Sequence, residues 1–220
     1  MKWFVLGLLV SGFFLAFLLL PAGRADWPAA YASVALLVSG WVLAAWRLQT
    51  TNPVLFARRA EYGEGTPNWD KWLVFVLKLS VLAVFILAGL DSGRVARLPE
   101  WWSGLLGVFL YSVGLQIFMA SQKANPFFEG MVRHQNEFGH RVVDRGPYAR
   151  LRHPGYLGFL LVFASIPCLL GSTWAAWGLI PVLACFVTRI VLEEAFLCEH
   201  LPGYTEYRQR VCYRLIPGLW

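Results

Sequence analysis

The sequence predicts an all-α integral membrane protein with about six membrane helices. Of its 220 residues, 58% are hydrophobic and only 15% are charged, whereas soluble domains average about 25% charged residues. The apolar residues are gathered in runs close to the roughly 20 residues that a helix needs to cross a bilayer core. The six runs that meet or nearly meet this length are residues 3–20, 29–46, 72–90, 101–121, 156–170 and 173–196.

The first two runs contain few residues with reactive side chains. They are rich in Leu, Val and Ala, and several tryptophans fall near their ends, as expected at membrane interfaces. The first run is longer than the apolar core of a signal peptide and is followed by a poor cleavage site, so we expect it to remain as a helix. We interpret residues 1–220 as one membrane-embedded domain, in which residues 1–121 anchor and pack and residues 122–220 form the catalytic region.

The positive charges predict the orientation. With six crossings, the two termini and the loops at 47–71 and 122–153 share one side, which collects 14 Lys and Arg residues against three on the other side. The positive-inside rule places the termini and these loops in the cytoplasm. Contact with anionic lipid accounts for the net charge of +6, so no nucleic-acid partner is expected, and no protein partner is inferred.

The later runs predict two close helix contacts. Ser103, Gly107 and Gly114 fall on one face of the fourth run and favour the close approach of another helix, although they would also suit a cofactor wall. Gly171-Ser172 alone separates the fifth run from the sixth. These two runs therefore predict a tight helical hairpin whose short first arm need not cross the full bilayer.

The loop from 122 to 153 is too long for a simple connection. Met131, Gln135 and Phe138 recur in it at helical spacing, which predicts a short interfacial helix. Pro154 suits the first turn of the next helix, with His153 as its N-cap residue. We expect this loop and the C-terminal tail to cover a pocket.

Charged residues near the end of the last run are costly at membrane depth and point to a site. Arg189 and Glu193 are four residues apart and are therefore expected to pair, whereas Glu194 points about 100° away and needs another partner. The alternative is a helix-end ion pair with an interfacial glutamate. His140, Tyr148, Arg152, His153 and Tyr156 lie in the preceding loop and helix start, and no pattern of ligands there predicts a metal site.

Several separated motifs then occur in register: His140-x-Val142-x-x-x-Gly146-Pro147-Tyr148-x-x-x-Arg152-His153-Pro154-x-Tyr156-x-Gly158, followed by Glu193-Glu194-x-x-Leu197 and Arg214-Leu215-Ile216-Pro217-Gly218. They resemble the signature of the isoprenylcysteine carboxyl methyltransferase family, which is similar to phospholipid N-methyltransferases. The resemblance covers residues 140–220, and Asn125-Pro126-Phe127-Phe128 is similar to a bacterial subgroup.

This resemblance implies S-adenosylmethionine as the methyl donor and an acceptor in or on the membrane, either a lipid or a lipophilic small molecule with a carboxylate, amine or thiol. It implies an inner-membrane protein with a cytoplasmic active site. The residues implied to bind the cofactor are His140, Val142, Gly146, Tyr148, His153, Tyr156 and Glu194. The residues implied to be catalytic are Arg189, Glu193 and Arg152.

Two other functions compete with this one. A non-enzymatic membrane protein, for binding or assembly, could retain the fold. Membrane sterol reductases, which use NADPH, are similar in their C-terminal region, but that family has about ten spans. Absence of S-adenosylmethionine binding in a folded sample would exclude the methyltransferase.

Overall fold

The computed structural model describes residues 2–59, 63–95 and 97–220. Within these ranges the chain is helical and has no strand, as predicted. In chain order the elements are α1 (Lys2–Ala22), α2 (Pro28–Thr51), α3 (Pro53–Arg58), α4 (Asn68–Leu90), η1 (Gly93–Val95), α5 (Trp101–Ala124), η2 (Asn136–Phe138), η3 (Gly146–Ala149), α6 (Pro154–Leu170), α7 (Thr173–His200) and α8 (Tyr204–Arg210).

The long helices are those of an integral membrane protein. In the described part of the chain, five are long and apolar enough to cross a bilayer, namely α1, α2, α4, α5 and α7. The sixth predicted span, α6, is apolar but has only 17 residues. The length of α6 agrees with the expectation that the first arm of the hairpin is short.

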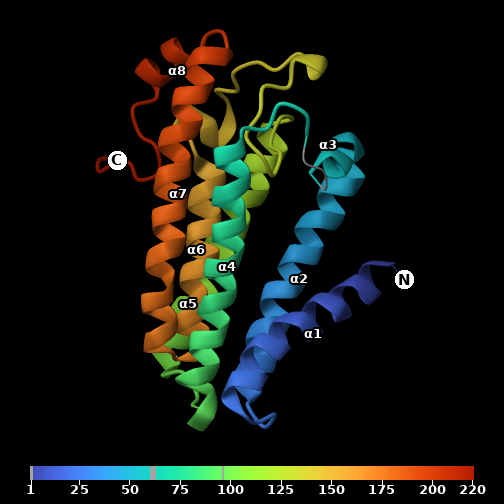
Figure 1. Ribbon diagram of the computed structural model, residues 1–220, viewed down its shortest axis with the longest axis vertical. Coiled ribbons are helices and arrows are strands. Elements are labelled where there is room, and N and C mark those ends of the chain that lie inside the picture. Colours follow the sequence, from blue (N-terminus) through green and yellow to red (C-terminus); the bar gives the residue numbers. More distant parts are fainter. Residues whose placement is uncertain (1, 60–62, 96) are drawn as a thin grey trace.

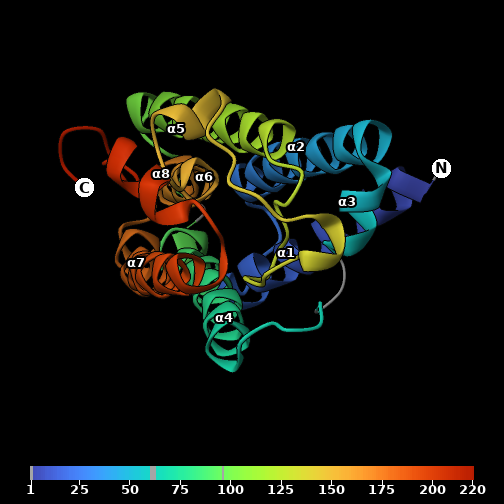
Figure 2. The same ribbon diagram turned by 90° about the horizontal axis from the view of Figure 1, so that it is seen from above.

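The long helices gather into a bundle from which α1 and α2 diverge (Figure 1). Helix α5 lies along α6, and α4 lies along α7. Figure 2, from above, places α5 and α2 on one side of the molecule and α4 on the other. The apolar core therefore lies where α4, α6 and α7 meet the lower parts of α1 and α2.

Glycines bring α5 and α6 together, as their spacing predicted. A Cβ atom on Gly114 would lie 2.7 Å from the carbonyl oxygen of Gly158, and a Cβ on Gly158 would lie 2.8 Å from that of Gly114. Gly107 likewise faces Leu169 of α6. Because these glycines face a neighbouring helix, the alternative that they form a cofactor wall is wrong.

The predicted hairpin is formed by a two-residue turn between α6 and α7. Gly171 ends α6 with φ of 60°, a conformation that glycine adopts without strain. The Ser172 side chain then caps α7 by accepting from the backbone of Ala175 at 3.1 Å. The end of α4 holds this turn, because Asp91 accepts hydrogen bonds from the Ser172 hydroxyl (2.9 Å) and from the Trp174 backbone (3.2 Å).

The predicted interfacial helix around Met131, Gln135 and Phe138 is wrong. The only helical element there within the described residues is the single turn η2. Side chains take up the backbone groups that a helix would use: the Val132 N–H donates to Asp70 at 2.7 Å, and the Gln135 N–H donates to the His140 ring at 3.3 Å. The segment is thus irregular, and the side chains of Asp70 and His140 hold its backbone in place.

The C-terminal tail packs against the start of α6. The backbone N–H groups of Arg152 and His153 donate to the carbonyl oxygens of Tyr213 and Arg214 at 2.9 and 3.0 Å. His153 precedes α6 and Pro154 occupies its first turn, as predicted, but the His153 side chain makes no capping bond.

Candidate active site

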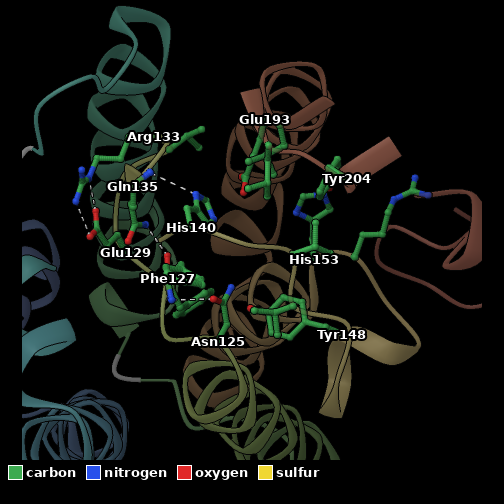
Figure 3. A pocket seen from close by; sticks show the side chains of 18 of the residues that line it. Asn125, Phe127, Glu129, Arg133, Gln135, His140, Tyr148, His153, Glu193 and Tyr204 are labelled. Carbon is green, nitrogen blue, oxygen red and sulfur yellow. Dashed lines mark hydrogen bonds and ion pairs between the residues drawn. The ribbon is translucent and has the colours of Figure 1, made fainter. Parts of the chain in front are cut away.

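A cavity lies at the end of the bundle where the loop 125–153, the start of α6, the end of α7 and α8 meet (Figure 3). Its empty volume, including the open mouth, is about 820 Å³. Aromatic and apolar side chains line it together with both signs of charge.

Most of the residues singled out in the sequence meet at this cavity. Those that line it are His140, Val142, Tyr148, Arg152, His153, Tyr156, Arg189 and Glu193. Gly146 and Glu194 are not among the lining residues: Gly146 forms a turn with φ of 59°, and Glu194 lies behind Arg152 and His153.

Arg189 does not pair with Glu193. Its guanidinium donates instead to both carboxylate oxygens of Asp70, at 2.7 and 3.1 Å, and to the carbonyl oxygen of Gly130 at 2.8 Å. The expected pairing was wrong because α7 packs against α4, and the first turn of α4 presents a fully buried acid to the arginine.

Glu193 is thereby left without a basic partner among the described residues. It accepts a short hydrogen bond from the Tyr156 hydroxyl. The Tyr156 ring is stacked on His153, with centroids 5.5 Å apart and planes 2° apart, and the Arg189 guanidinium lies 5.3 Å from its centroid. Tyr156 therefore joins the two cavity-facing charges without the charges pairing with each other.

Glu194 has the separate partners that its direction required. It accepts from Arg152 at 2.6 Å and from Arg214 at 2.9 Å, and it lies 3.2 Å from the His153 ring. Arg152 in turn donates to the carbonyl oxygen of Val211 at 2.8 Å. This buried network joins the loop, α7 and the tail behind the cavity, so Arg152 and Glu194 support the wall.

His140 is set up as a neutral imidazole. Its Nδ1 accepts from the Gln135 backbone, and its ring lies 4.7 Å from that of Phe127 (Figure 3). Burial lowers the pKa of His140 to about 4, and the nearby His134 and Arg133 add to this shift. At neutral pH the ring is therefore uncharged.

The Tyr204 hydroxyl is buried and, in the described part of the chain, has no hydrogen-bond partner. Tyr204 lines the cavity (Figure 3). A buried hydroxyl without a partner is unfavourable by about 1–3 kcal/mol, which points to a polar ligand that completes it. The sequence analysis missed this residue because only its place in the fold reveals the missing partner.

A second group missed from the sequence forms the opposite wall. Arg133 donates to Glu129 at 2.7 and 3.0 Å and also to Glu137, and Arg58 lies 3.3 Å from Glu129. Arg58 comes from α3, so the loop after α2 does contribute to the surroundings of the cavity. These charges are paired with one another and hold the wall in place.

Comparison with known proteins agrees with the motifs. The model of the isoprenylcysteine carboxyl methyltransferase (ICMT) family matches residues 105–199. A protein-S-isoprenylcysteine O-methyltransferase of Dictyostelium discoideum is 27% identical over 127 residues, which is 54% of this chain and 50% of that protein. Protein-S-isoprenylcysteine O-methyltransferase A of Arabidopsis thaliana is 31% identical over 115 residues, 51% of this chain and 58% of its own.

The resemblance to the isoprenylcysteine carboxyl methyltransferase family is confirmed. The match runs from α5 to the end of α7 and so includes the loop, the hairpin and both glutamates. Asp70 and Arg58 lie outside it. The chain spans about half the length of the curated methyltransferases that it matches.

Proposed function

We propose that the protein is an S-adenosylmethionine-dependent methyltransferase that acts on a lipophilic or membrane-associated acceptor. The observation that carries the proposal is the cavity, in which the buried Tyr204 hydroxyl lacks a partner among the described residues and Glu193 has only Tyr156. The similarity of residues 105–199 to isoprenylcysteine methyltransferases supports the same reading.

The residues present suit the donor, which carries a sulfonium, an ammonium and a carboxylate. Tyr148, Phe127 and Tyr204 offer aromatic faces for the adenine and, through cation–π attraction, for the sulfonium. Arg141 lies at the mouth of the cavity and offers a positive charge to the carboxylate. The donor, when bound, supplies an electrophilic methyl group.

Val142, His140 and His153 would complete this binding surface. Val142 contributes apolar wall, and His140 contributes a neutral ring. Gly146 and Glu194 would act from behind it, Gly146 through the turn before Tyr148 and Glu194 by fixing Arg152 and His153.

Glu193 and Arg189 would face the acceptor. For a carboxylate acceptor the chain needs only to align the reacting groups, and alignment contributes up to about 7–11 kcal/mol in favourable cases. For an amine or thiol, Glu193 or the neutral His140 would take the proton. The acceptor named for the relatives is isoprenylcysteine, and an amphiphile of that kind suits a site at the end of membrane helices.

We also propose that the cavity lies on the cytoplasmic side of an inner membrane. The basic loops and the tail that surround it carry most of the positive charge of the chain, which supports that orientation.

Calorimetric titration of the detergent-solubilised protein with S-adenosylmethionine tests the proposal. We expect binding by the wild type and a roughly 2–12-fold weaker Kd for Tyr204→Phe, the range given by one net hydrogen bond of about 0.5–1.5 kcal/mol. Tyr213→Phe, on the exposed tail, is the matched control and should bind normally.

Absence of binding in a folded sample contradicts the proposal, and saturable binding of NADPH in its place would support the reductase alternative. Methyl-labelled donor, incubated separately with S-isoprenylated N-acetylcysteine, phosphatidylethanolamine vesicles and a long-chain alkyl thiol, then identifies the acceptor class. Binding without transfer to any of them favours the non-enzymatic alternative.

A further inference from the structure

Asp70 is a buried acid in the first turn of α4, far in sequence from the other residues of the site. It is fully buried and 119 residues from Arg189, yet it binds both the Nε and the Nη2 of that guanidinium. It lies outside the region that matches the family model, in the half of the chain that composition marks as anchoring. The pair of Asp70 with Arg189 therefore joins the cavity to the N-terminal half, as the contact of Arg58 with Glu129 does at the opposite wall.

We propose that Asp70 is a positioning residue for the methyl transfer, an inference that rests on the proposed function. It holds Arg189 away from Glu193 and against the Tyr156 ring, and so keeps the Glu193 carboxylate bonded to Tyr156 and accessible from the cavity. Asp70 itself does not line the cavity and acts through Arg189.

The competition between two acids is the physical basis. Arg189 and Glu193 are four residues apart on α7, a spacing at which oppositely charged side chains pair. A buried arginine deprived of its carboxylate is strongly destabilised and would turn to the nearest remaining acid. Without the charge of Asp70, Glu193 would become that acid and would leave the Tyr156 hydroxyl.

The same ion pair also holds the cavity wall. Asp70 accepts from the Val132 N–H at 2.7 Å, and Arg189 donates to the carbonyl oxygen of Gly130 at 2.8 Å. Met131 and Val132 line the cavity, in a segment that has no helix of its own to stiffen it. Asp70 thus sets the position of the Arg189 guanidinium and of the cavity-lining backbone at Val132.

The chain offers a matched control on the same helix. Asp91, at the far end of α4, also joins α4 to α7, through Ser172 and Trp174. Asp70→Asn and Asp91→Asn each remove one carboxylate charge from an α4–α7 contact. Only the first contact touches the cavity, so the pair of variants separates a loss of stability from a loss of positioning.

The experiment measures three quantities for both variants: the Kd for S-adenosylmethionine, kcat and KM with the acceptor probe labelled best by the wild type, and hydrogen exchange at residues 129–135. For Asp70→Asn we expect a Kd and KM within about threefold of wild type. We expect kcat to be roughly 100-fold lower, as for a catalytic group displaced by about 1 Å, and the backbone N–H of Val132 to exchange faster. Asp91→Asn should keep kcat within about twofold.

The inference is overturned if Asp70→Asn retains its kcat, or if Asp91→Asn loses as much. If Asp70→Asn does not fold, Asp70→Glu replaces it: it keeps the charge but moves the carboxylate by one methylene, and an unchanged kcat again overturns the inference. If the wild type neither binds the donor nor transfers a methyl group, both the proposed function and this inference are wrong. If the wild type and Asp70→Asn are equally active, only the inference is wrong.

Discussion

At the scale of single residues, the buried arginines of the site pair across elements. Arg189 of α7 binds Asp70 of α4, and Arg152 before α6 binds Glu194 of α7. A buried ion pair contributes little net stability, but removal of one partner is costly. These pairs therefore specify how the helices and the loop meet around the cavity.

His140 makes a prediction about pH. Its pKa in the folded protein, about 4, lies below the ordinary value of 6.5, so between these values the unfolded chain binds a proton that the folded chain does not. The stability due to this residue is therefore complete above about pH 6.5 and is lost as the pH falls toward 4.

We expect the thermal unfolding midpoint of wild type to fall more steeply between pH 6.5 and 4.5 than that of His140→Asn. The imidazole C2–H resonance of His140, assigned by its absence in the variant, should titrate near pH 4. Two results would contradict this prediction: a titration midpoint of the His140 resonance near pH 6.5, or unfolding midpoints of wild type and His140→Asn that fall in parallel with pH. Either result would show that the ring is accessible to solvent and takes up a proton as in the unfolded chain.

Sequence reasoning found the residues at the cavity better than it found their partners. Arg189, Glu193 and Glu194 stood out because charge is rare in an apolar helix. Asp70 did not, because an acid in the first turn of a helix is ordinary there and favours the helix dipole. The pairing of Asp70 with Arg189 depends on the packing of α4 against α7, which no local pattern encodes.

At the scale of elements, the contact between α5 and α6 places the start of α6 beside the cavity. Gly114→Ala should destabilise the protein by about 1–3 kcal/mol, as overpacking does, because the new methyl group meets the backbone of α6 at Gly158 and Val162. Gly104→Ala on the same helix is the control, since its nearest neighbour would be 3.8 Å away.

Thermal unfolding in detergent compares the two variants. Gly104→Ala should be neutral or slightly stabilising, because alanine favours helix over glycine by up to about 1 kcal/mol. Equal midpoints for Gly114→Ala and wild type would mean that the two helices can separate without penalty.

The longer the apolar run of an element, the more reliably the sequence predicted that element. The five long helices and the shorter α6 were evident from hydropathy, whereas the loop around Gln135 was mistaken for a helix. Helical spacing of apolar residues is a weak signal when side chains such as Asp70 and His140 bind the backbone groups of the segment. Such bonds join residues that are distant along the chain or lie outside the periodic pattern.

At the scale of the whole molecule, the proposed orientation can be tested with one native thiol. Cys212 is exposed on the tail beside the cavity, and Asp26 is exposed in the connection between α1 and α2 at the opposite end. In variants that keep only Cys212, or carry only Asp26→Cys, a membrane-impermeant maleimide reports the side.

We expect Cys212 to react only in inverted membrane vesicles and the cysteine at position 26 only in right-side-out spheroplasts. The wholly cysteine-free protein controls for background labelling. The reverse pattern would place the cavity on the outer face and contradict the proposed location.

Helix α4 is fastened to α7 by an aspartate at each end, Asp70 at one and Asp91 at the other. Two distant contacts on one helix oppose both sliding and tilting, because either motion breaks an ion pair at one end or hydrogen bonds at the other. Helix α1 is largely unburied along its apolar stretch. Under the proposed function, we therefore expect the hydrocarbon chain of an acceptor to enter from the bilayer along the flank that α1 borders rather than between α4 and α7, which are joined at both ends.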